Sequence, residues 1–415
     1  MASTTSLPSL LDSMKAQAPS WEQIKRGPLF ILTNYSNVLM FLFFVGAGLW
    51  QTKRKRDEAK KVPQHSALPA PDFPTVTELE KFDLNTTEPL KLRPFKPKYH
   101  VSMDGDTALE TLDPNDLLVM DKNYQPRITH RRRIIEQSAA IAIGVNDDKR
   151  IRPAVCELYT FLTGTYLPLR YPSMFRVHHT EYEYGKACVL QNLVTGEMLP
   201  TSATGSSTPT FALLRTLGRH LDEDLLLLLP ETNAQGGVVK KDAKYVLEAY
   251  VACCPSGFNP AEKLGKKLRD IHGPVPGYAA KLEGSMDRFF AKLEHGKYVK
   301  RANWSVSMDG ELFQPGLGTT HAHEGEELRE FTGELDPDKT FVRCERQTLH
   351  RLPRSKALVF GIKTYLYPLR KIKEEGLGEE LAAAIDGLKE GNVPEMHFYK
   401  RGGEWGTAVK KYLRS

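Results

Sequence analysis

The chain has 415 residues, of which 40% are hydrophobic and 26% are charged. This balance is typical of one large or two ordinary globular domains, and it excludes wholesale disorder and a collagen-like rod. The formal net charge is +6, and no basic stripe interleaved with aromatic residues follows, so composition does not indicate nucleic-acid binding. The five cysteines contain no CxxC pair, which argues against a disulfide framework or zinc ribbon and favours reduced thiols.

An apolar stretch near the N-terminus predicts a membrane anchor. Residues 1–27 form a polar tail, whereas residues 28–50 are uncharged and become continuously apolar from position 38. This length just suffices for a single helix to cross a bilayer of about 30 Å. Basic residues are more numerous after the stretch than before it, so the positive-inside rule places the C-terminal part in the cytosol.

The segment that follows is expected to connect this anchor to a folded domain. Residues 51–89 are first charged and then rich in proline, which is typical of a tether. The globular domain is expected over residues 90–415.

Hydrophobic periodicity predicts a mixture of helices and strands within this domain. Helices are expected over 157–167, 211–229 and 373–389, and strands over 245–253, 340–349 and 357–366. The last two strands are separated by a segment that contains Pro353, so they are expected to form an antiparallel hairpin. Because helices and strands do not alternate regularly, the sequence favours an α+β fold with an antiparallel sheet.

A helix over 259–272 carries the best single candidate for cofactor binding. Asn259 is a good N-cap, Pro260 suits the first turn, and Glu262 completes a capping box. Apolar residues recur on one face, and His272 continues that face at the C-terminal end. A buried imidazole there could be an axial ligand of a metal or haem, but a core histidine bonded to a carbonyl is the more common arrangement.

Other residues leave two interpretations open. Glu223 and Asp224, close to His220, could move protons beside a cofactor or form a solvated helix face. The basic residues of the hairpin could hold carboxylates such as haem propionates or simply be exposed; these are Arg343, Arg346, Arg351 and Arg354.

Three weaker candidates have the residue types of metal ligands. Cys254 could be a thiolate ligand or an inert buried thiol. His321 and His323 could bind a metal, although a surface loop is favoured, and at most one of His178 and His179 could face a site on a strand. The chain has none of the G-x-G-x-x-G, P-loop, H-E-x-x-H or G-x-S-x-G motifs.

Several motifs occur in an order that resembles a known family. They are IHGPVPGY at 271–278, MDRFF at 286–290, RANW at 301–304, ERQTLHRLP at 345–353 and IKTYL at 362–366. In this order they resemble the haem-dependent oxidative N-demethylase α-subunit-like family, especially its fungal membrane-tethered branch. The resemblance covers roughly residues 90–399.

The resemblance implies a PAS-like fold that holds haem b. It also implies oxidation of a small amine with oxygen, using electrons from a separate flavin and iron–sulfur reductase; the bacterial relative removes a methyl group as formaldehyde. His272 would be the axial ligand and Tyr278, in the same motif, would lie beside the cofactor. Glu223 and Asp224 match a Glu-Asp-Leu string of the family. The resemblance implies that they handle protons or bind the amine.

The resemblance also implies that Arg346 and Gln347, from the ERQTL string, line the haem or substrate site. The chain departs from the family at the anchor, which the bacterial enzyme lacks, at Asp222, where relatives often carry Gln, and at Cys253 and Cys254, which replace a more apolar pair. Substrate identity is therefore not transferred. The alternative function is a membrane-tethered haem sensor or carrier without catalysis.

Overall fold

The computed structural model describes residues 70–100, 109–182, 185–203, 207–233, 237, 243–316 and 320–415. The chain divides into two compact units, residues 1–64 and 65–415. The predicted anchor over 28–50 lies outside the described residues. Within the described ranges, no helix combines the length and the apolarity that a bilayer crossing requires.

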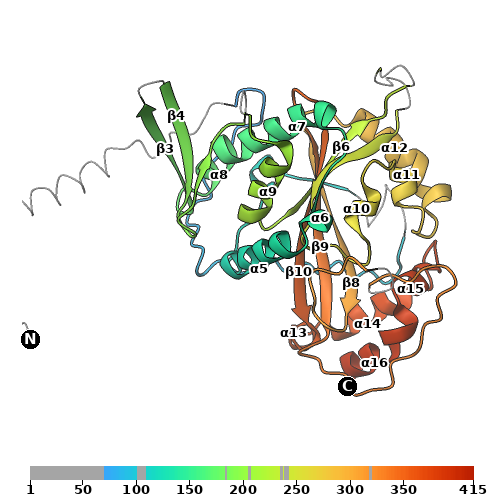
Figure 1. The fold of residues 1–415 in the computed structure, drawn as a ribbon. Coiled ribbons are helices and arrows are strands. Elements are labelled where there is room, and N and C mark those ends of the chain that lie inside the picture. The colour runs from blue at the N-terminus through green and yellow to red at the C-terminus, as the bar shows by residue number, and fades with distance from the viewer. Residues whose placement is uncertain are drawn as a thin grey trace, which may run out of the picture. The chain divides into compact units, whose positions relative to one another are not determined.

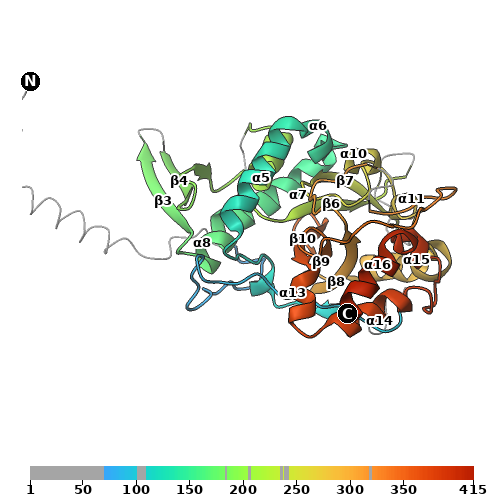
Figure 2. The same ribbon diagram turned by 90° about the horizontal axis from the view of Figure 1, so that it is seen from below.

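The second unit is built on a seven-stranded antiparallel sheet (Figure 1). In spatial order its strands are β1 (Glu110–Thr111), β8 (Tyr298–Ser307), β9 (Phe341–Arg351), β10 (Leu358–Pro368), β6 (Asp224–Pro230), β7 (Tyr245–Val251) and β2 (Ile143–Val145). A smaller sheet contains β3 (Phe175–Tyr182), β4 (Gly185–Asn192) and β5 (Met198–Pro200), and in both views its hairpin projects away from the rest of the unit (Figures 1 and 2).

Different helices cover the two faces of the large sheet (Figures 1 and 2). One face carries α5 (Tyr124–Gln137), α6 (Ala139–Ala142), α7 (Asp148–Phe161), a π-helical turn (Leu162–Tyr166), α8 (Leu167–Arg170) and α9 (Thr210–His220). We call this the N-terminal face. The other, which we call the motif face, carries α10 (Pro260–Lys263), α11 (Leu268–Ile271), a second π-helical turn (Tyr278–Leu282) and α12 (Glu283–Lys292).

The C-terminal helices pack on one end of the sheet. They are α13 (Leu369–Glu374), α14 (Gly378–Gly387), α15 (Met396–Tyr399) and α16 (Gly402–Arg414). Trp405 and Val409 of α16 share a core cluster with Val342 of β9. The same cluster contains the buried residues of α12, so α12 and the C-terminal helices share one hydrophobic core.

The alternation of side chains along the strands assigns each residue to one face. Leu225, Leu227 and Val359 belong to the core of the N-terminal face, whereas Leu349 and Leu358 belong to the core of the motif face. Residues that pair directly across an antiparallel sheet point to the same side. The pairing of Val359 with His350 therefore places His350 on the N-terminal face.

The strand predictions are confirmed, and the antiparallel α+β fold with them. Strand β7 lies within the predicted 245–253, and β9 and β10 form the predicted hairpin with full register from Leu358 opposite Arg351 to Pro368 opposite Phe341. The turn between them contains Pro353.

The predicted helix over 211–229 is wrong in its second half. Helix α9 ends at His220, and the leucine-rich run from Asp224 to Pro230 is strand β6. This strand lies near the centre of the sheet and is covered on both faces, so its side chains are apolar without alternation. A short apolar run of this kind cannot be distinguished from a helix by periodicity alone.

Two other predicted helices are each divided by a glycine. Residues 259–272 form α10 and α11, and the backbone of Gly265 between them has a φ of +75°. Residues 373–389 form the end of α13 and α14, with Gly376 at a φ of +77° between them. Left-handed backbone at these points interrupts a helix, and glycine adopts it without a Cβ clash.

Residues 70–89, which the sequence assigns to the tether, contact the sheet-bearing unit. The ring of Phe73 stacks on Phe161 with the ring centroids 3.9 Å apart, and Phe82 meets Tyr171 edge to face at 5.0 Å. Val76 is buried in the same core. This part of the chain therefore packs as part of the folded unit.

A buried ion pair joins helix α5 to the start of β6. Arg131 is 1% exposed and donates to Asp224 Oδ1 at 2.6 Å and to the carbonyls of Gly218 and Glu223 at 3.0 and 2.8 Å. The backbone N–H groups of Cys253 and Cys254 donate to the two oxygens of the same carboxylate. One carboxylate thus connects α5, β6 and the end of β7.

Breaking this pair should destabilise the fold strongly. We expect Arg131→Met to lower the free energy of unfolding by about 3–5 kcal/mol, because Asp224 is left as a buried charge without its cation. Urea denaturation measures the change. The control is Arg354→Met, which breaks the exposed pair with Asp72 and should cost about 0–1 kcal/mol. Equal losses in the two variants would contradict this role for Arg131.

Candidate functional site

His272 lies at the C-terminal end of α11 with its imidazole held in one orientation. Its Nδ1 lies 2.9 Å from the carbonyl oxygen of Leu268, one turn earlier. Because a carbonyl can only accept a hydrogen bond, Nδ1 carries the proton and Nε2 keeps its lone pair. Burial lowers the pKa of His272 to about 4, so the ring is neutral at pH 7. This hydrogen bond is the one expected of a core histidine, and it is also the one by which a metal-binding histidine is oriented, so it fits both interpretations of His272.

Tyr278 packs against this imidazole. The two rings stack with their centroids 4.8 Å apart and an angle of 14° between their planes. Gly277 precedes the tyrosine with a φ of +72°, and a Cβ there would lie 2.7 Å from Val393 Cγ2. The glycine of the IHGPVPGY motif is thus needed both for the turn and for close packing, and this turn brings Tyr278 back onto His272.

Arg301 is one of two cations, with Lys263, whose charge acts on His272, and neither was among the candidates from sequence. It lies on β8 opposite Gln347, and its Nε donates to Gln347 Oε1 at 2.7 Å. Gln347 Nε2 in turn donates to Glu345 Oε2 at 2.8 Å. The charge of Arg301 further lowers the pKa of His272, which places the two groups within electrostatic reach. Arg301 belongs to the RANW motif, which was the only sequence signal for it.

Three of the four arginines of the hairpin are buried or partly buried and donate mainly to backbone carbonyls. Arg343 is fully buried and donates to the carbonyls of Cys254, Glu311 and Leu312. The other two are occupied in the same way: Arg346 donates to the carbonyls of Asp116 and Leu117, and Arg351 to those of Phe290, Leu293 and Lys356. Their main contacts are structural. Of the four hairpin arginines, only Arg354 is exposed. Exposure was one of the two interpretations that the sequence left open for them.

Three consecutive acidic residues lie where the chain enters β6, and the structure distinguishes them. Asp222 accepts from Arg127 at 2.8 Å and pairs with Lys363 at 3.4 Å. Although burial opposes ionisation, these two cations hold the pKa of Asp222 below its usual range. Asp224 is occupied by Arg131 and two backbone amides, as described above. Both carboxylates are therefore occupied by direct donors and have a structural role.

Glu223 differs from its two neighbours. Its Oε1 receives one long hydrogen bond, from the Val119 N–H at 3.4 Å, and lies 4.0 Å from Arg346. Burial raises the pKa of Glu223 to about 7, and the charges of Arg346 and Lys363 only partly oppose this rise. Glu223 is thus the carboxyl group of this cluster that changes charge near neutral pH.

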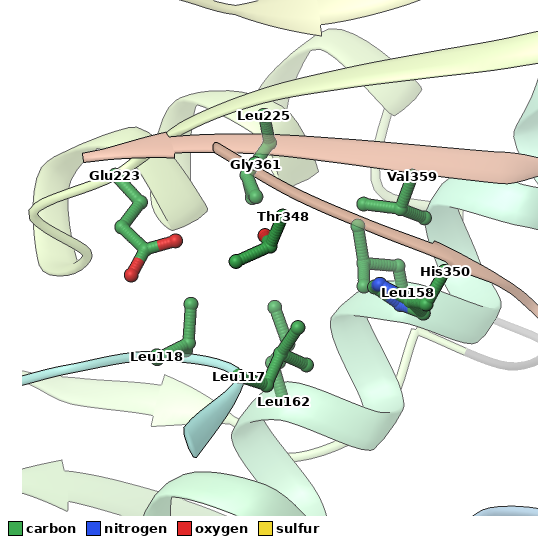
Figure 3. Close-up of a pocket in the computed structure, with 10 residues that line it drawn as sticks. All are labelled: Leu117, Leu118, Leu158, Leu162, Glu223, Leu225, Thr348, His350, Val359 and Gly361. Atoms are coloured by element: carbon green, nitrogen blue, oxygen red, sulfur yellow. The ribbon is translucent and has the colours of Figure 1, made fainter. Parts of the chain in front are cut away.

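A small cavity lies beside Glu223 on the N-terminal face (Figure 3). All the empty space in it, its opening included, amounts to about 230 Å³. Its walls are Leu117, Leu118, Leu158, Leu162, Leu225, Val359 and Gly361, and its polar groups come from Glu223, Thr348 and His350. Most of this volume lies at the opening, and the enclosed space is sufficient for about one water molecule.

Glu223 and His272 are not brought together, because they belong to opposite faces of the sheet. Glu223 faces Gly361, Thr348 and the helices of the N-terminal face. Ile271, next to His272, packs with Leu226 and Tyr250 beneath α11. The site residues inferred from sequence therefore separate into two places: His272, Tyr278 and Gln347 on the motif face, and Glu223 with Arg346 on the other.

The weaker ligand candidates have other partners. Burial raises the pKa of the Cys254 thiol, which argues against a thiolate. His323 pairs with Glu326, and the His321 ring stacks on Tyr399. His178 contacts Gln191 at 2.8 Å. Among the described residues, no three His, Cys, Asp or Glu side chains are grouped as a metal site would require.

These features define an α+β domain with an antiparallel sheet, in which His272 is a neutral imidazole with its Nδ1 proton held by a carbonyl. A family model described as "Haem-dependent oxidative N-demethylase, alpha subunit-like" matches residues 108–410. Because the match covers most of the chain, the protein belongs to this family. Membership supports a haem cofactor and an oxidoreductase of this general class.

The raised pKa of Glu223 should appear in the pH dependence of stability. The folded-state pKa of about 7 exceeds the usual 4.5, so the folded state binds the proton more tightly. The resulting stabilisation is complete below about pH 4.5 and is lost as the pH rises through 7. Glu223→Gln removes this dependence. Relative to the wild type, its free energy of unfolding should rise by about 2.5 kcal/mol between pH 5 and pH 8, because a shift of one pKa unit corresponds to about 1.4 kcal/mol.

Urea denaturation of both proteins at the two pH values gives this difference, because every other titrating group is common to both. A difference that does not change between pH 5 and pH 8 would contradict the raised pKa.

Proposed function

We propose that this protein is a haem-dependent oxidoreductase that oxidises a small amine, with His272 as the axial ligand of haem b. The observation that carries the proposal is the hydrogen bond from His272 Nδ1 to the Leu268 carbonyl, which leaves Nε2 unprotonated and directed by the fold. The low pKa of the ring keeps this lone pair available across the physiological range. An antiparallel sheet with a helical segment over one face supports the PAS-like fold that we propose for the domain.

The surroundings of His272 suit a flat apolar group with a charged edge. Val299, Leu349, Phe360 and Leu226 pair in one row across four strands on the motif face. Three of them, all except Leu349, are only partly buried. Arg301 supplies a guanidinium at the same face, and a guanidinium binds carboxylates in a bidentate manner. The sequence contains no CxxCH, so the haem would be held without thioether bonds.

The residues of the motif face would act as binding and orienting groups. When bound, haem supplies the oxygen chemistry. His272 would hold the iron through Nε2, and the Leu268 carbonyl and the Tyr278 ring would keep the imidazole in place. Gln347 would orient Arg301 toward a propionate, and Glu345 would fix Gln347 in turn.

Electrons would come from a separate reductase. The chain has no dinucleotide-binding G-x-G-x-x-G motif and no cysteine spacing for an iron–sulfur cluster. We propose further that residues 28–50 anchor the protein in a membrane with the domain facing the cytosol, in accordance with the basic residues that follow the apolar stretch.

The absorption spectrum tests the cofactor and its ligand. Purified full-length wild-type protein should show a Soret band, and His272→Ala should lose or shift it, because the iron loses its axial nitrogen. The matched control is His295→Ala, at an exposed position, which should keep the spectrum. An unchanged Soret band in His272→Ala would refute the ligand assignment.

Absence of any Soret band after reconstitution of the wild type would refute the haem mechanism. A Soret band without oxidation of any amine, in the presence of a surrogate reductase, would leave the alternative of a haem sensor or carrier.

Haem retention tests Arg301. We expect Arg301→Gln to weaken haem binding by about tenfold or more, since a hydrogen bond to a charged group contributes about 1.5–3 kcal/mol. The axial ligand, and hence the position of the Soret band, should not change. Transfer of haem to apomyoglobin measures the loss, with Arg354→Gln as the control for a surface arginine. Equal transfer rates in the two variants would contradict the propionate contact.

A further inference from the structure

The segment that carries His272 leaves positive charge on the surface of the motif face. Residues 263–292, from the last residue of α10 to the last residue of α12, contain seven basic and three acidic residues. Two of the basic residues are engaged, Lys263 with the carbonyl of Ile271 and Lys267 with Glu231. The other five are exposed and form no ion pair with a described residue. We call them the basic group; they are Lys266, Arg269, Lys281, Arg288 and Lys292.

The acidic residues of the segment neutralise little of this charge. Glu283 and Asp287 of α12 both pair with Lys244, and the Glu283 carboxylate lies 3.7 Å from the lysine Nζ. Their charges are thus directed to a cation outside the segment. Asp270 is the one acidic residue of 263–292 that is left to oppose the basic group. An excess of exposed positive charge therefore remains on this face, and such a surface attracts anionic partners.

Helix α12 separates its charges onto two flanks. Lys281, Arg288 and Lys292 follow one another at intervals of seven and four residues, and residues with this spacing lie on one side of a helix. Met286 and Phe290 are buried, so the core-facing side of the helix lies between this flank and the acidic one. The three cations therefore stand together on one edge of the helix.

The basic group lies beside the imidazole of His272. Tyr278, which stacks on that imidazole, begins the π-helical turn that contains Lys281. A Cβ on Gly277 would lie 3.7 Å from Lys281 Cδ, so the stem of the lysine lies against the turn that precedes Tyr278. Pro274, two residues after His272, is exposed. The loop that follows the imidazole thus reaches the surface that carries the cations.

The surface between the cations is small and apolar. Pro274, Ala279 and Ala280 are exposed, and along the chain they lie between Arg269 and Lys281. Protein–protein interfaces commonly have an apolar centre and a polar rim. Short side chains at such a centre allow a partner to approach the backbone closely. This arrangement therefore suits contact with another folded protein.

An anionic membrane is the other surface that a group of cations could bind. A helix that lies on a membrane carries large apolar side chains, which enter the lipid. The large hydrophobic side chains that are exposed among the described residues are Leu90, Met198, Phe211 and Phe398. None of these belongs to residues 263–292, so the observations favour a protein partner.

We propose that the basic group is the docking surface for an acidic protein that delivers electrons to the site of His272. The inference rests on the proposed function, because a haem at this site needs electrons from outside the chain. In each encounter the partner gives up one electron and is oxidised, the iron is reduced, and no bond forms or breaks. Complexes of this kind are small and short-lived, and complementary charge mainly speeds their formation.

Binding of acidic electron carriers tests the proposal. The probes are a flavodoxin and a plant-type ferredoxin, and biolayer interferometry with immobilised full-length protein measures each dissociation constant. We expect binding at about 10 mM ionic strength and its loss at about 1 M, because the screening length falls from about 30 Å to about 3 Å. A basic cytochrome c is the control for nonspecific adhesion, and it should not bind.

Charge reversal locates the docking surface. We expect Lys281→Glu, Arg288→Glu and Lys292→Glu together to weaken flavodoxin binding by at least about tenfold at low ionic strength. The matched control reverses three exposed cations on the helices of the N-terminal face and should bind as the wild type does; it combines Arg133→Glu, Lys149→Glu and Arg215→Glu. Both variants should keep the Soret band. If the first variant fails to fold, exchange of the same three residues for Gln should give a smaller loss in the same direction.

Three results would overturn the proposal. They are no binding of either probe at low ionic strength, equal binding by the two charge-reversed variants, and tighter binding of phosphatidylserine vesicles than of the probes. His272→Ala separates this proposal from the proposed function. It should lose or shift the Soret band and still bind flavodoxin, whereas reversal of the basic group should keep the band and lose the binding.

Discussion

The two-residue alternation along β9, held in register by β8 and β10, is the constraint on which both candidate sites depend. Gln347 and Leu349 point to the motif face, and Thr348 and His350 point to the other. A slip of one residue in this pairing would exchange the two sets. The register thus places the partner of Arg301 near His272, and it brings an unsatisfied imidazole to a cavity on the far side of the sheet.

Burial of charge explains why neighbouring residues of one type behave differently. Asp222, Glu223 and Asp224 are consecutive and all buried, but only two of them meet a cation directly. In a medium of low dielectric constant an ion without a partner is costly, so the third carboxyl group shifts its pKa instead. The contacts also separate Arg343, Arg346 and Arg351, which donate mainly to carbonyls, from Arg301. The one hydrogen bond of Arg301 with a described residue is to the side chain of Gln347.

Local patterns in the sequence were sufficient where the structure depends on nearby residues. Asn259 caps α10 through Ala261 N–H, and the hairpin of β9 and β10 follows its apolar runs and its turn. These local patterns were insufficient where segments far apart in the sequence determine how a residue packs. The leucines of 225–229 become a strand because helices cover both faces of the sheet. The arginines of the hairpin are drawn inward by carbonyls from segments more than thirty positions away, such as Cys254 and Leu117.

By itself the sequence determined the α+β class, the ordered motifs of the family, and His272 as the residue to examine, because caps, turns and apolar periods are properties of short segments. Tertiary structure alone decided that His272 and Glu223 lie on opposite faces of one sheet and that Glu223, Thr348 and His350 line one cavity. It also decided that the charge of Arg301, rather than those of the hairpin arginines, acts on the imidazole. These facts depend on the pairing of strands far apart in the chain, and no local pattern encodes which residues that pairing brings together.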